Sequence, residues 1–340
     1  MDSNLNILIT TGIYPPKIGG PAQYAKNLKI TLENMGNSVS VKTFSVEDYL
    51  PTGIRHIFFF FKIIPRVIKS DVVIILDTFS AGLPTVLACK LFGKKSIVRT
   101  GGDFLWEQYV ERTGKKVLLR NFYKDERHNF SKKENIILSL SKWTLLNTSA
   151  VVFSTEWQRD IFMDVYNLQK QKIYIVENYY GVKETGLLPQ GKIFIASTRN
   201  LRWKNINMLK RVFDKVRLQH PEAILFLDNV SFPDFMNKIK NCYAVLQVSL
   251  GDISPNLILD AIRYGKPFIC TKEVGILPRI SDAGIFVDPL NEAEVERAIL
   301  TLLGEAEYRK AKEKVENFSF VHTWNDIAHE FIQITNFLKK

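Results

Sequence analysis

Three segments of the sequence combine residue types that could bind a phosphorylated ligand. The first runs from Tyr14 to Tyr24 and holds Gly19 and Gly20 between a predicted strand and a predicted helix. Glycines at that place let backbone amides approach an anion at a helix N-terminus, where the dipole also favours negative charge. The dinucleotide spacing Gly-x-Gly-x-x-Gly and the Walker phosphate loop are missing, so nicotinamide chemistry and simple nucleotide hydrolysis lose their main support. A purely structural, glycine-rich loop is the alternative.

The second segment, residues 197–205, follows a predicted strand and precedes an amphipathic helix. Its cations are Arg199 and Lys204, which we expect on one loop at the carboxyl end of a sheet, where open α/β sheets bind ligands. A forked guanidinium and an ammonium that reach the same place suit a diphosphate. Two solvated surface cations are the alternative.

The third segment, residues 249–267, predicts a helix whose N-terminus could bind an anion. Ser254 followed by Pro255 predicts an N-cap and a first helical position. The backbone amides of Asn256 and Leu257 would then face forward as donors to an anion.

Two acidic residues flank that helix start. Asp252 lies on the loop before the helix, and Asp260 projects from its first turns. Burying such carboxylates costs free energy unless each has a ligand or a hydrogen-bond partner. In the alternative interpretation, Asp260 is a surface acid that complements the helix dipole.

Taken together and in this order, the three segments resemble the retaining glycosyltransferases of family 4, which have the two-domain GT-B architecture. The resemblance extends over nearly the whole chain. The pair Asp252 and Asp260 matches the family's acid-x7-acid motif, and Arg199 and Lys204 match its Arg and Lys at their five-residue spacing. The other matching positions are Gly19 and Gly20, Glu177-Asn178, Ala261, Gly265-Lys266-Pro267, Gly275 to Pro278 and Asp282 to Pro289.

The resemblance implies a hexosyltransferase-like enzyme that moves a sugar from a nucleotide-sugar donor to a glycan or lipid-linked acceptor with retention, in surface polysaccharide or glycolipid biosynthesis. It implies no cofactor and no metal, because two cations and a helix dipole can stabilise the departing diphosphate. Asp252 would orient the donor sugar, and Asp260 would hold the ribose hydroxyls. The donor-binding residues that it implies are Gly19, Gly20, Arg199, Lys204, Asn256, Leu257 and Asp260.

The chain departs from the family pattern at two places. Both acids of the motif are aspartates where the family usually has glutamates. None of the five histidines follows the fourth predicted strand, where many members carry one, and Asp103 is our candidate catalytic substitute near the acceptor, together with Glu107. Asp103 could equally cap the next helix. A catalytically silent homologue that binds a nucleotide-sugar, or that partners another transferase, is therefore the alternative function.

Short β-branched runs alternate with amphipathic stretches, which predicts two Rossmann-like, doubly wound parallel sheets facing a cleft. We expect domains at 1–176 and 177–320, with a helix over 321–340 that crosses back to the first domain. Residues 178–190 are the predicted hinge. The predicted strands of the first series are 6–10, 38–42, 72–76, 96–99 and 150–153, and those of the second are 173–176, 192–196, 223–227, 244–248, 267–270 and 284–287.

The net charge of +11 allows nucleic acid, an anionic membrane or a phosphorylated ligand as partner. Residues 1–176 carry +9 and residues 177–340 carry +2, which assigns the excess to the acceptor side. Residues 55–69, rich in Phe and basic side chains, predict either a core helix or, with the basic residues of 115–133, a peripheral contact with an anionic membrane. We expect no nucleic-acid partner, because no helix-turn-helix, RNP motif or zinc module accompanies the charge.

Three widely spaced cysteines, Cys89, Cys242 and Cys270, fit reduced core thiols. We therefore expect a cytoplasmic protein, in keeping with an N-terminus that lacks the features of a signal peptide. No segment reaches the roughly 18 to 20 uninterrupted apolar residues of a membrane span.

Overall fold

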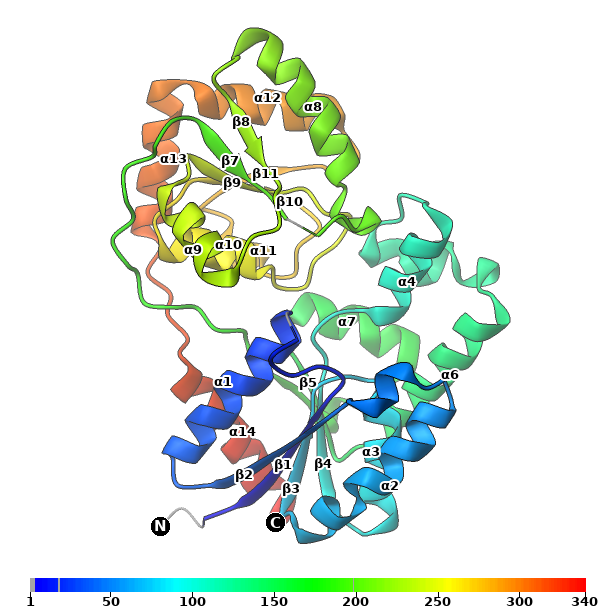
Figure 1. The fold of residues 1–340 in the computed structure, drawn as a ribbon. Coiled ribbons are helices and arrows are strands. Elements are labelled where there is room, and N and C mark those ends of the chain that lie inside the picture. Colours follow the sequence, from blue (N-terminus) through cyan, green and yellow to red (C-terminus); the bar gives the residue numbers. More distant parts are fainter. Residues whose placement is uncertain (1–3, 18, 198) are drawn as a thin grey trace. The chain divides into compact units, whose positions relative to one another are not determined.

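A computed structural model of the chain describes residues 4–17, 19–197 and 199–340. The internal contacts divide the chain into two units. The first unit comprises Met1–Leu105, Asn129–Asn178 and His322–Lys340, and the second comprises Trp106–His128 and Tyr179–Val321. Each unit is an α/β unit built around one parallel sheet (Figure 1).

The first unit contains a six-stranded sheet in the order β2-β1-β3-β4-β5-β6, and every strand pairs in parallel. All four residues of β3 and of β5 are buried, as expected for strands covered by helices on both faces. The strands are β1 (Asn6–Thr11), β2 (Ser38–Thr43), β3 (Val72–Ile75), β4 (Lys95–Arg99), β5 (Ala150–Phe153) and β6 (Ile173–Ile175).

The helices of the first unit form two layers. Helix α14 packs against α1, whereas α2, α3 and α6 pack side by side in that order (Figure 1). The α-helices are α1 (Gly20–Asn34), α2 (Ile54–Lys69), α3 (Gly82–Leu91), α6 (Lys132–Asn147), α7 (Glu156–Tyr166) and α14 (Trp324–Lys339). The 3-10 helices are η1 (Val46–Tyr49), η3 (Arg127–Asn129), which reaches the unit at its last residue, and η4 (Lys170–Lys172).

The second unit contains a five-stranded parallel sheet in the order β11-β10-β9-β7-β8. Successive residues of a strand face opposite layers. Phe194 of β7 accordingly joins the apolar cluster that includes residues of α8 and α12, while Ile195 joins the cluster that includes residues of α9 and α10. The strands are β7 (Ile193–Ile195), β8 (Ile224–Phe226), β9 (Ala244–Gln247), β10 (Phe268–Thr271) and β11 (Ile285–Val287).

The helices of the second unit cover both faces of this sheet. They are α8 (Ile206–Gln219), α9 (Phe232–Asn241), α10 (Asn256–Arg263), α11 (Leu277–Ile280), α12 (Glu292–Leu303), α13 (Glu305–Asn317) and the 3-10 helix η5 (Arg202–Lys204). Residues 106–128 add most of α4 (Phe104–Thr113), together with η2 (Leu119–Asn121) and α5 (Phe122–Asp125). We call residues 106–128 the arm, because the chain leaves the first unit at Leu105 and returns to it at Asn129.

The predicted GT-B elements are confirmed strand by strand, with one reassignment. Residues 173–176, which we expected to open the second series, contain β6 (Ile173–Ile175), which pairs with β5 in the first sheet. The chain then crosses at Asn178, the first residue of the predicted hinge, and returns at His322. The two residues at these crossing points are in contact within the first unit, since Nδ1 of His322 lies 3.0 Å from the carbonyl oxygen of Asn178.

The C-terminal helix α14 buries one apolar face. Ile327, Phe331 and Ile334 are buried in α14, and Leu338 is half-buried. The three cysteines are free and buried. Burial raises the pKa of the thiols of Cys89 and Cys242 to about 12, as expected for inert core thiols.

The net charge is divided more evenly between the two structural units than between residues 1–176 and 177–340. The first unit holds 20 Lys+Arg and 14 Asp+Glu, a net charge of +6, and the second holds 26 and 21, a net charge of +5. The arm accounts for part of the change, because it carries six basic residues and four acidic ones into the second unit. Any electrostatic preference for a partner must therefore be sought on particular surfaces.

Candidate functional site

The carboxyl edge of the second sheet holds an ion pair between two of the predicted site residues. Nζ of Lys204 lies 2.8 Å from Oδ2 of Asp252, and their side chains are only 10% and 14% exposed. Lys204 ends η5, after β7, and Asp252 follows β9, so the pair joins two neighbouring strands of the sheet. A largely buried ion pair at such an edge is a suitable anchor for a charged ligand.

The loop that carries Asp252 is held by hydrogen bonds on both sides. Nε2 of Gln247 donates to Oδ2 of Asp252 at 2.9 Å and lies 3.2 Å from Oγ of Ser249. The backbone of Asp252 pairs in parallel with Val274, and its N–H donates to the carbonyl of Glu273 at 2.9 Å. These contacts hold the Asp252 carboxylate in place through both its side chain and its backbone.

Asn205 fixes the loop that carries Lys204. Its backbone is left-handed, with φ of 59°, a conformation that asparagine tolerates better than most residues. Its buried side-chain amide donates to the carbonyls of Val248 at 3.3 Å and Pro289 at 2.8 Å. One side chain thus ties the start of α8 to the segments that follow β9 and β11.

The arm contacts the loops that carry this ion pair. The ring centroids of Trp106 and Trp203 are 5.6 Å apart, and the N–H of Leu119 donates to the carbonyl of Leu250 at 3.3 Å. These contacts lie next to Lys204 and two residues before Asp252 in the chain. The arm therefore belongs to the surroundings of the candidate site.

Two polar contacts and one glycine complete the packing of the arm. Nε of Arg120 lies 2.8 Å from Oε2 of Glu273, and the backbone N–H of Arg202 donates to Oε1 of Glu111 at 2.7 Å. A Cβ atom at Gly251 would lie 2.5 Å from Cβ of Leu119, closer than side chains allow. Gly251 is thus needed for the close approach between the loop and the arm.

The helix start expected at Ser254 is shifted by one residue. Helix α10 begins at Asn256, and Pro255 occupies the N-cap position with φ of −72° and ψ of 111°. The hydroxyl of Ser254 is buried without a hydrogen-bond partner among the described residues, and α10 has no side-chain cap, so the predicted Ser254 cap is wrong. Pro255 starts the helix through its carbonyl, which accepts from the N–H of Ile258 at 3.0 Å.

The first turn of α10 keeps its predicted anion donors. The amides of Asn256 and Leu257 precede the first intrahelical bond and have no acceptor within the helix. Asn256 is exposed and Leu257 half-buried, so a ligand can reach this turn. The geometry fits an anion at the N-terminus of an eight-residue helix.

Asp260 lies one turn further along α10. Burial raises the pKa of its carboxyl to about 6, and the charge of Arg263 opposes this shift. Within the described ranges, the Asp260 carboxylate takes part in no ion pair, in contrast to Asp252. A largely buried carboxyl with a perturbed pKa and no ion-pair partner among the described residues is a candidate for ligand binding.

The remaining predicted residues are distributed over both units. Arg199 is exposed on the loop after β7, and Lys204 rather than Arg199 makes the contact with Asp252. In the first unit, Gly19 is the N-cap of α1 and Gly20 its first residue. Asp103 is buried, 3% exposed, and directly precedes α4. Two residues of the predicted segments, Ile18 and Thr198, lie outside the described residues.

Gln247 and Asn205 are the functional residues that the sequence patterns missed. Gln247 is 2% exposed in β9, and its signal was a single polar residue within an apolar run. Asn205 directly follows Lys204, and its signal was an asparagine at a helix start. The contacts of the arm had no comparable signal, because they join segments more than 80 positions apart.

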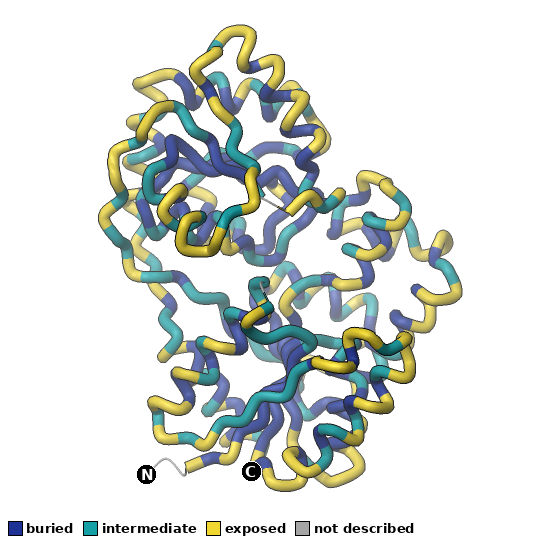
Figure 2. The backbone as a smooth tube through the Cα atoms, in the orientation of Figure 1, coloured by how far each residue is buried: buried dark blue, intermediate teal, exposed yellow. Residues whose placement is uncertain are grey.

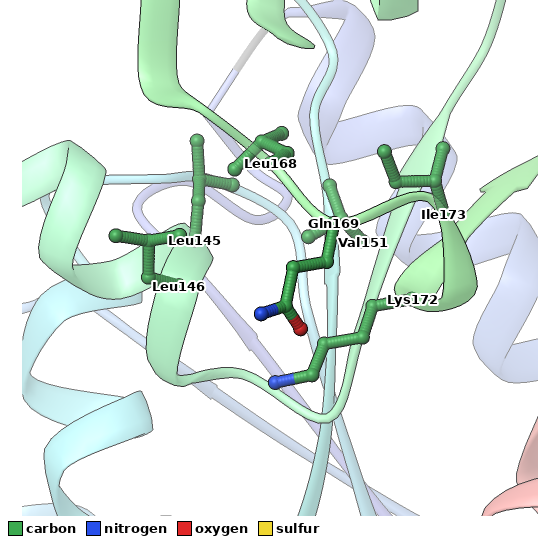
Figure 3. Close-up of a pocket in the computed structure, with 7 residues that line it drawn as sticks. All are labelled: Leu145, Leu146, Val151, Leu168, Gln169, Lys172 and Ile173. Atoms are coloured by element: carbon green, nitrogen blue, oxygen red, sulfur yellow. The ribbon is translucent and has the colours of Figure 1, made fainter.

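A small pocket in the first unit is separate from these residues. It has a volume of about 190 Å³ and is lined by the aliphatic side chains of α6, β5 and residues 168–173, with Gln169 and Lys172 beside them (Figure 3). It includes none of the predicted site residues. Across the described ranges, no group of three His, Cys, Asp or Glu side chains gathers as a metal site would require.

The fold is similar to that of several glycosyltransferases of known structure. Sucrose-phosphate synthase from Thermosynechococcus elongatus matches with a TM-score of 0.70 at 12% identity, with 98% of each chain covered. HepE from Anabaena, solved in complex with UDP-glucose, matches with a TM-score of 0.62 at 14% identity, again with 98% of each chain covered. The lipopolysaccharide outer core galactosyltransferase WaaB in its apo form matches with a TM-score of 0.62 at 17% identity, over 98% of this chain and 99% of that one.

No protein-family model matches the sequence, and no curated protein matches it either. The structural likenesses cover nearly the whole chain at low identity, so they establish its fold. The chain has the GT-B fold, with two parallel-sheet units and a C-terminal helix that returns to the first.

Proposed function

We propose that the protein is a glycosyltransferase that takes its sugar from a nucleotide-sugar donor. The observation that carries the proposal is the ion pair of Lys204 and Asp252 beside the N-terminus of α10, in a chain with the GT-B fold. Similar chains include HepE, which was solved with UDP-glucose, and WaaB, a galactosyltransferase. These neighbours favour a nucleotide-sugar over other phosphorylated ligands.

The donor diphosphate would be bound by Arg199, Lys204 and the amides of Asn256 and Leu257. An ammonium group has three donors, so Lys204 can keep Asp252 and still reach a phosphate oxygen. Asp252, held by Gln247, would then accept hydrogen bonds from hydroxyls of the donor sugar. In this proposal Lys204 binds the diphosphate and Asp252 binds the sugar, which gives both members of the largely buried ion pair a role.

Asp260 would accept hydrogen bonds from the ribose hydroxyls. A ligand that donates to the ionised carboxylate compensates for its burial and lowers its pKa from about 6. Aspartate is shorter by one methylene than the glutamate usual in family 4, so either the backbone sits closer to the ribose or a water bridges the two.

The transfer would be retaining and independent of metal, as in family 4. The new bond joins an acceptor oxygen to the anomeric carbon while the bond from that carbon to the diphosphate oxygen breaks on the same face. The electron pair of the broken bond stays on the diphosphate, and the proton of the acceptor hydroxyl passes to a diphosphate oxygen. The cations and the α10 N-terminus stabilise the negative charge that develops on the diphosphate. The acceptor would be a glycan or lipid-linked sugar in surface polysaccharide or glycolipid synthesis.

The roles proposed for residues of the first unit rest on the family resemblance. Gly19 and Gly20 would close over the donor, and Asp103 would act near the acceptor in place of the family's histidine. The alternative function, a silent nucleotide-sugar-binding homologue, is favoured by the absence of that histidine and by the two aspartates of the motif.

Donor binding can be tested by thermal denaturation with UDP, GDP, ADP and their glucose derivatives. We expect one nucleotide to raise the melting temperature by several degrees, since a ligand at about 100 times its Kd adds about 2.7 kcal/mol of stability. Lys204→Ala should abolish that rise, whereas Lys192→Ala, at an exposed ion pair of the same unit, should keep it. Failure of every nucleotide to raise the melting temperature would contradict the proposal.

Catalysis can be separated from silent binding by donor hydrolysis without acceptor. We expect slow release of free sugar with the anomeric configuration of the donor, measured by NMR, unchanged by EDTA and lost in Asp252→Asn. Binding without release of sugar, alone and with candidate acceptor glycans, would instead support the silent homologue.

A further inference from the structure

Helix α2 of the first unit has an apolar stripe on each of two opposite faces. Phe59, Ile63 and Val67 are buried in the core of the unit. An ordinary surface helix would expose polar residues on its other face. The outward face of α2 instead presents large apolar side chains that are 46% to 65% exposed: Ile54, Ile57, Phe58, Phe61 and Ile68.

The apolar exposure continues onto the two helices packed beside α2. Nine of the 23 exposed large apolar side chains among the described residues lie on α2, α3 and α6, which together make up about an eighth of the chain. The contributions of the neighbours are Leu87 and Leu91 from α3, followed by Phe92, and Ile136 and Leu146 from α6. Figures 1 and 2 show the three helices and their exposed positions in the first unit. We call the outward surface of these helices the α2–α3–α6 face.

The charge on this face is of one sign. The three helices contain a single acidic residue, Glu134, which is 5% exposed and caps α6 through Ser131. Their basic residues are Arg55, Lys62, Arg66, Lys69, Lys90, Lys132, Lys133 and Lys142. Lys62 is engaged with Glu47, whereas Arg66, Lys69, Lys132 and Lys133 are exposed. Exposed apolar side chains flanked by cations match an anionic bilayer surface, which offers both an apolar layer and negative headgroups.

Helix α13 of the second unit has a different surface from the α2–α3–α6 face. Its exposed residues are of both signs and form pairs along the helix: Glu305 with Arg309, Glu307 with Lys310, and Lys312 with Glu316. That pattern suits a helix facing water. A second copy of the chain would fit the α2–α3–α6 face poorly, because it would bring two cationic surfaces together.

We propose that the α2–α3–α6 face docks the protein on an anionic lipid bilayer, with α2 lying along the surface. Within the described ranges, every helix falls short of the length and apolar character that a bilayer crossing requires. The inner stripe of α2 is also committed to the protein core, which leaves only its outer stripe for lipid. The proposed surface includes residues 55–69, which the sequence had already indicated as a membrane contact. It leaves out residues 115–128, which belong to the arm, and includes α3 and α6 instead. It does not depend on the proposed donor site.

Flotation of the full-length protein with vesicles tests the proposal. We expect binding to vesicles of phosphatidylcholine with phosphatidylglycerol and little binding to phosphatidylcholine alone. Arg66→Glu with Lys69→Glu should weaken binding at least about tenfold, because each basic residue near an anionic leaflet contributes about fivefold. Separately, Ile57→Ser with Phe61→Ser should also weaken binding at least about tenfold, because it removes apolar area that the bilayer would bury. The matched controls lie in the second unit and are also exposed: Leu218→Ser with Phe232→Ser, and Lys210→Glu with Arg217→Glu.

A fluorophore on the face gives an independent measurement. The three native cysteines are buried, so a label on Phe58→Cys is selective. We expect its emission to shift to the blue with anionic vesicles, whereas a label on Leu218→Cys should not shift. A nucleotide-induced rise in melting temperature that persists in the face variants would show that they fold and that donor binding is separate.

Three results would overturn the proposal. The first is equal flotation with both kinds of vesicle, and the second is an equal loss of binding in the control variants. The third is a concentration-dependent dimer, measured by light scattering, that disappears in the Ile57→Ser, Phe61→Ser variant, since it would assign the face to a second copy of the chain.

Discussion

Asp252 and Asp260 are the same residue type, eight positions apart in one unit, and their surroundings differ. Asp252 lies on a loop and has its charge matched by Lys204 at 2.8 Å and its geometry fixed by Gln247. Asp260 lies on α10, where burial raises its carboxyl pKa to about 6 and Arg263 compensates only in part. The protein therefore stabilises the first carboxylate by itself, whereas the second is left to be stabilised by a ligand.

Removal of Lys204 should have the largest effect. Lys204→Ala leaves the largely buried Asp252 charge with Gln247 as its one side-chain partner among the described residues, and breaking a buried ion pair costs about 3 kcal/mol of unfolding free energy. Under the proposed function it also removes a diphosphate ligand, so we expect transfer to fall about 100-fold or more. Urea denaturation and donor hydrolysis measure the two effects.

The Lys192–Glu222 pair serves as control. Its side chains are 31% and 50% exposed, so Lys192→Ala should cost less than about 1 kcal/mol. Adding Asp252→Asn to Lys204→Ala removes the unpaired charge and should recover part of the lost stability. A Lys204→Ala variant as stable as the wild type would show that Asp252 does not need its cation.

Asp260→Asn should stabilise the protein, in contrast to Lys204→Ala. A folded-state pKa of about 6, against 3.8 ordinarily, means that the folded protein binds the proton more tightly than the unfolded chain does. Wild-type stability should therefore fall as the pH rises from about 4 to about 6, and the variant should lack this fall. At pH 8 we expect the variant to be about 3 kcal/mol more stable in urea, with a difference below about 1 kcal/mol at pH 4. Equal curves at both pH values would contradict the raised pKa.

The same carboxyl should make nucleotide binding depend on pH. If ribose hydroxyls donate to ionised Asp260, affinity should rise about tenfold between pH 5 and pH 7, with release of less than one proton per nucleotide bound. Calorimetry in buffers of different ionisation enthalpy measures that release. Asp260→Asn should bind more weakly and without this dependence, while Asp252→Asn should retain it. Proton release that persists in Asp260→Asn would assign the titration to another group.

The parts of this site that depend on local sequence patterns could be predicted, whereas the parts that depend on long-range contacts could not. Every strand could be predicted because β-branched runs mark buried parallel strands, and Lys204 and Asp252 could be placed together because both follow strands of one sheet. Gln247 and the arm could not, since their roles depend on tertiary contacts such as that of Arg120 with Glu273, 153 positions away. The charge excess predicted for residues 1–176 changed for the same reason, because tertiary contacts place residues 106–128 in the second unit.

Ser254→Ala should have the smallest effect. It tests whether the N-terminus of α10, the helix that carries Asp260, is free to bind an anion. If Ser254 capped α10, the change would cost about 1 kcal/mol of unfolding free energy. Its hydroxyl is instead buried without a partner in the described part of the chain, and Pro255 is the N-cap, so we expect a change below about 0.5 kcal/mol in urea denaturation. Ser231→Ala is the matched control, because the Ser231 hydroxyl accepts from the N–H of Asp234 and does cap α9. Without a side-chain cap, the first amides of α10 stay open to an anion next to Asp260. A loss near 1 kcal/mol in Ser254→Ala would show that those amides are already satisfied by the protein and would weaken the proposed diphosphate site.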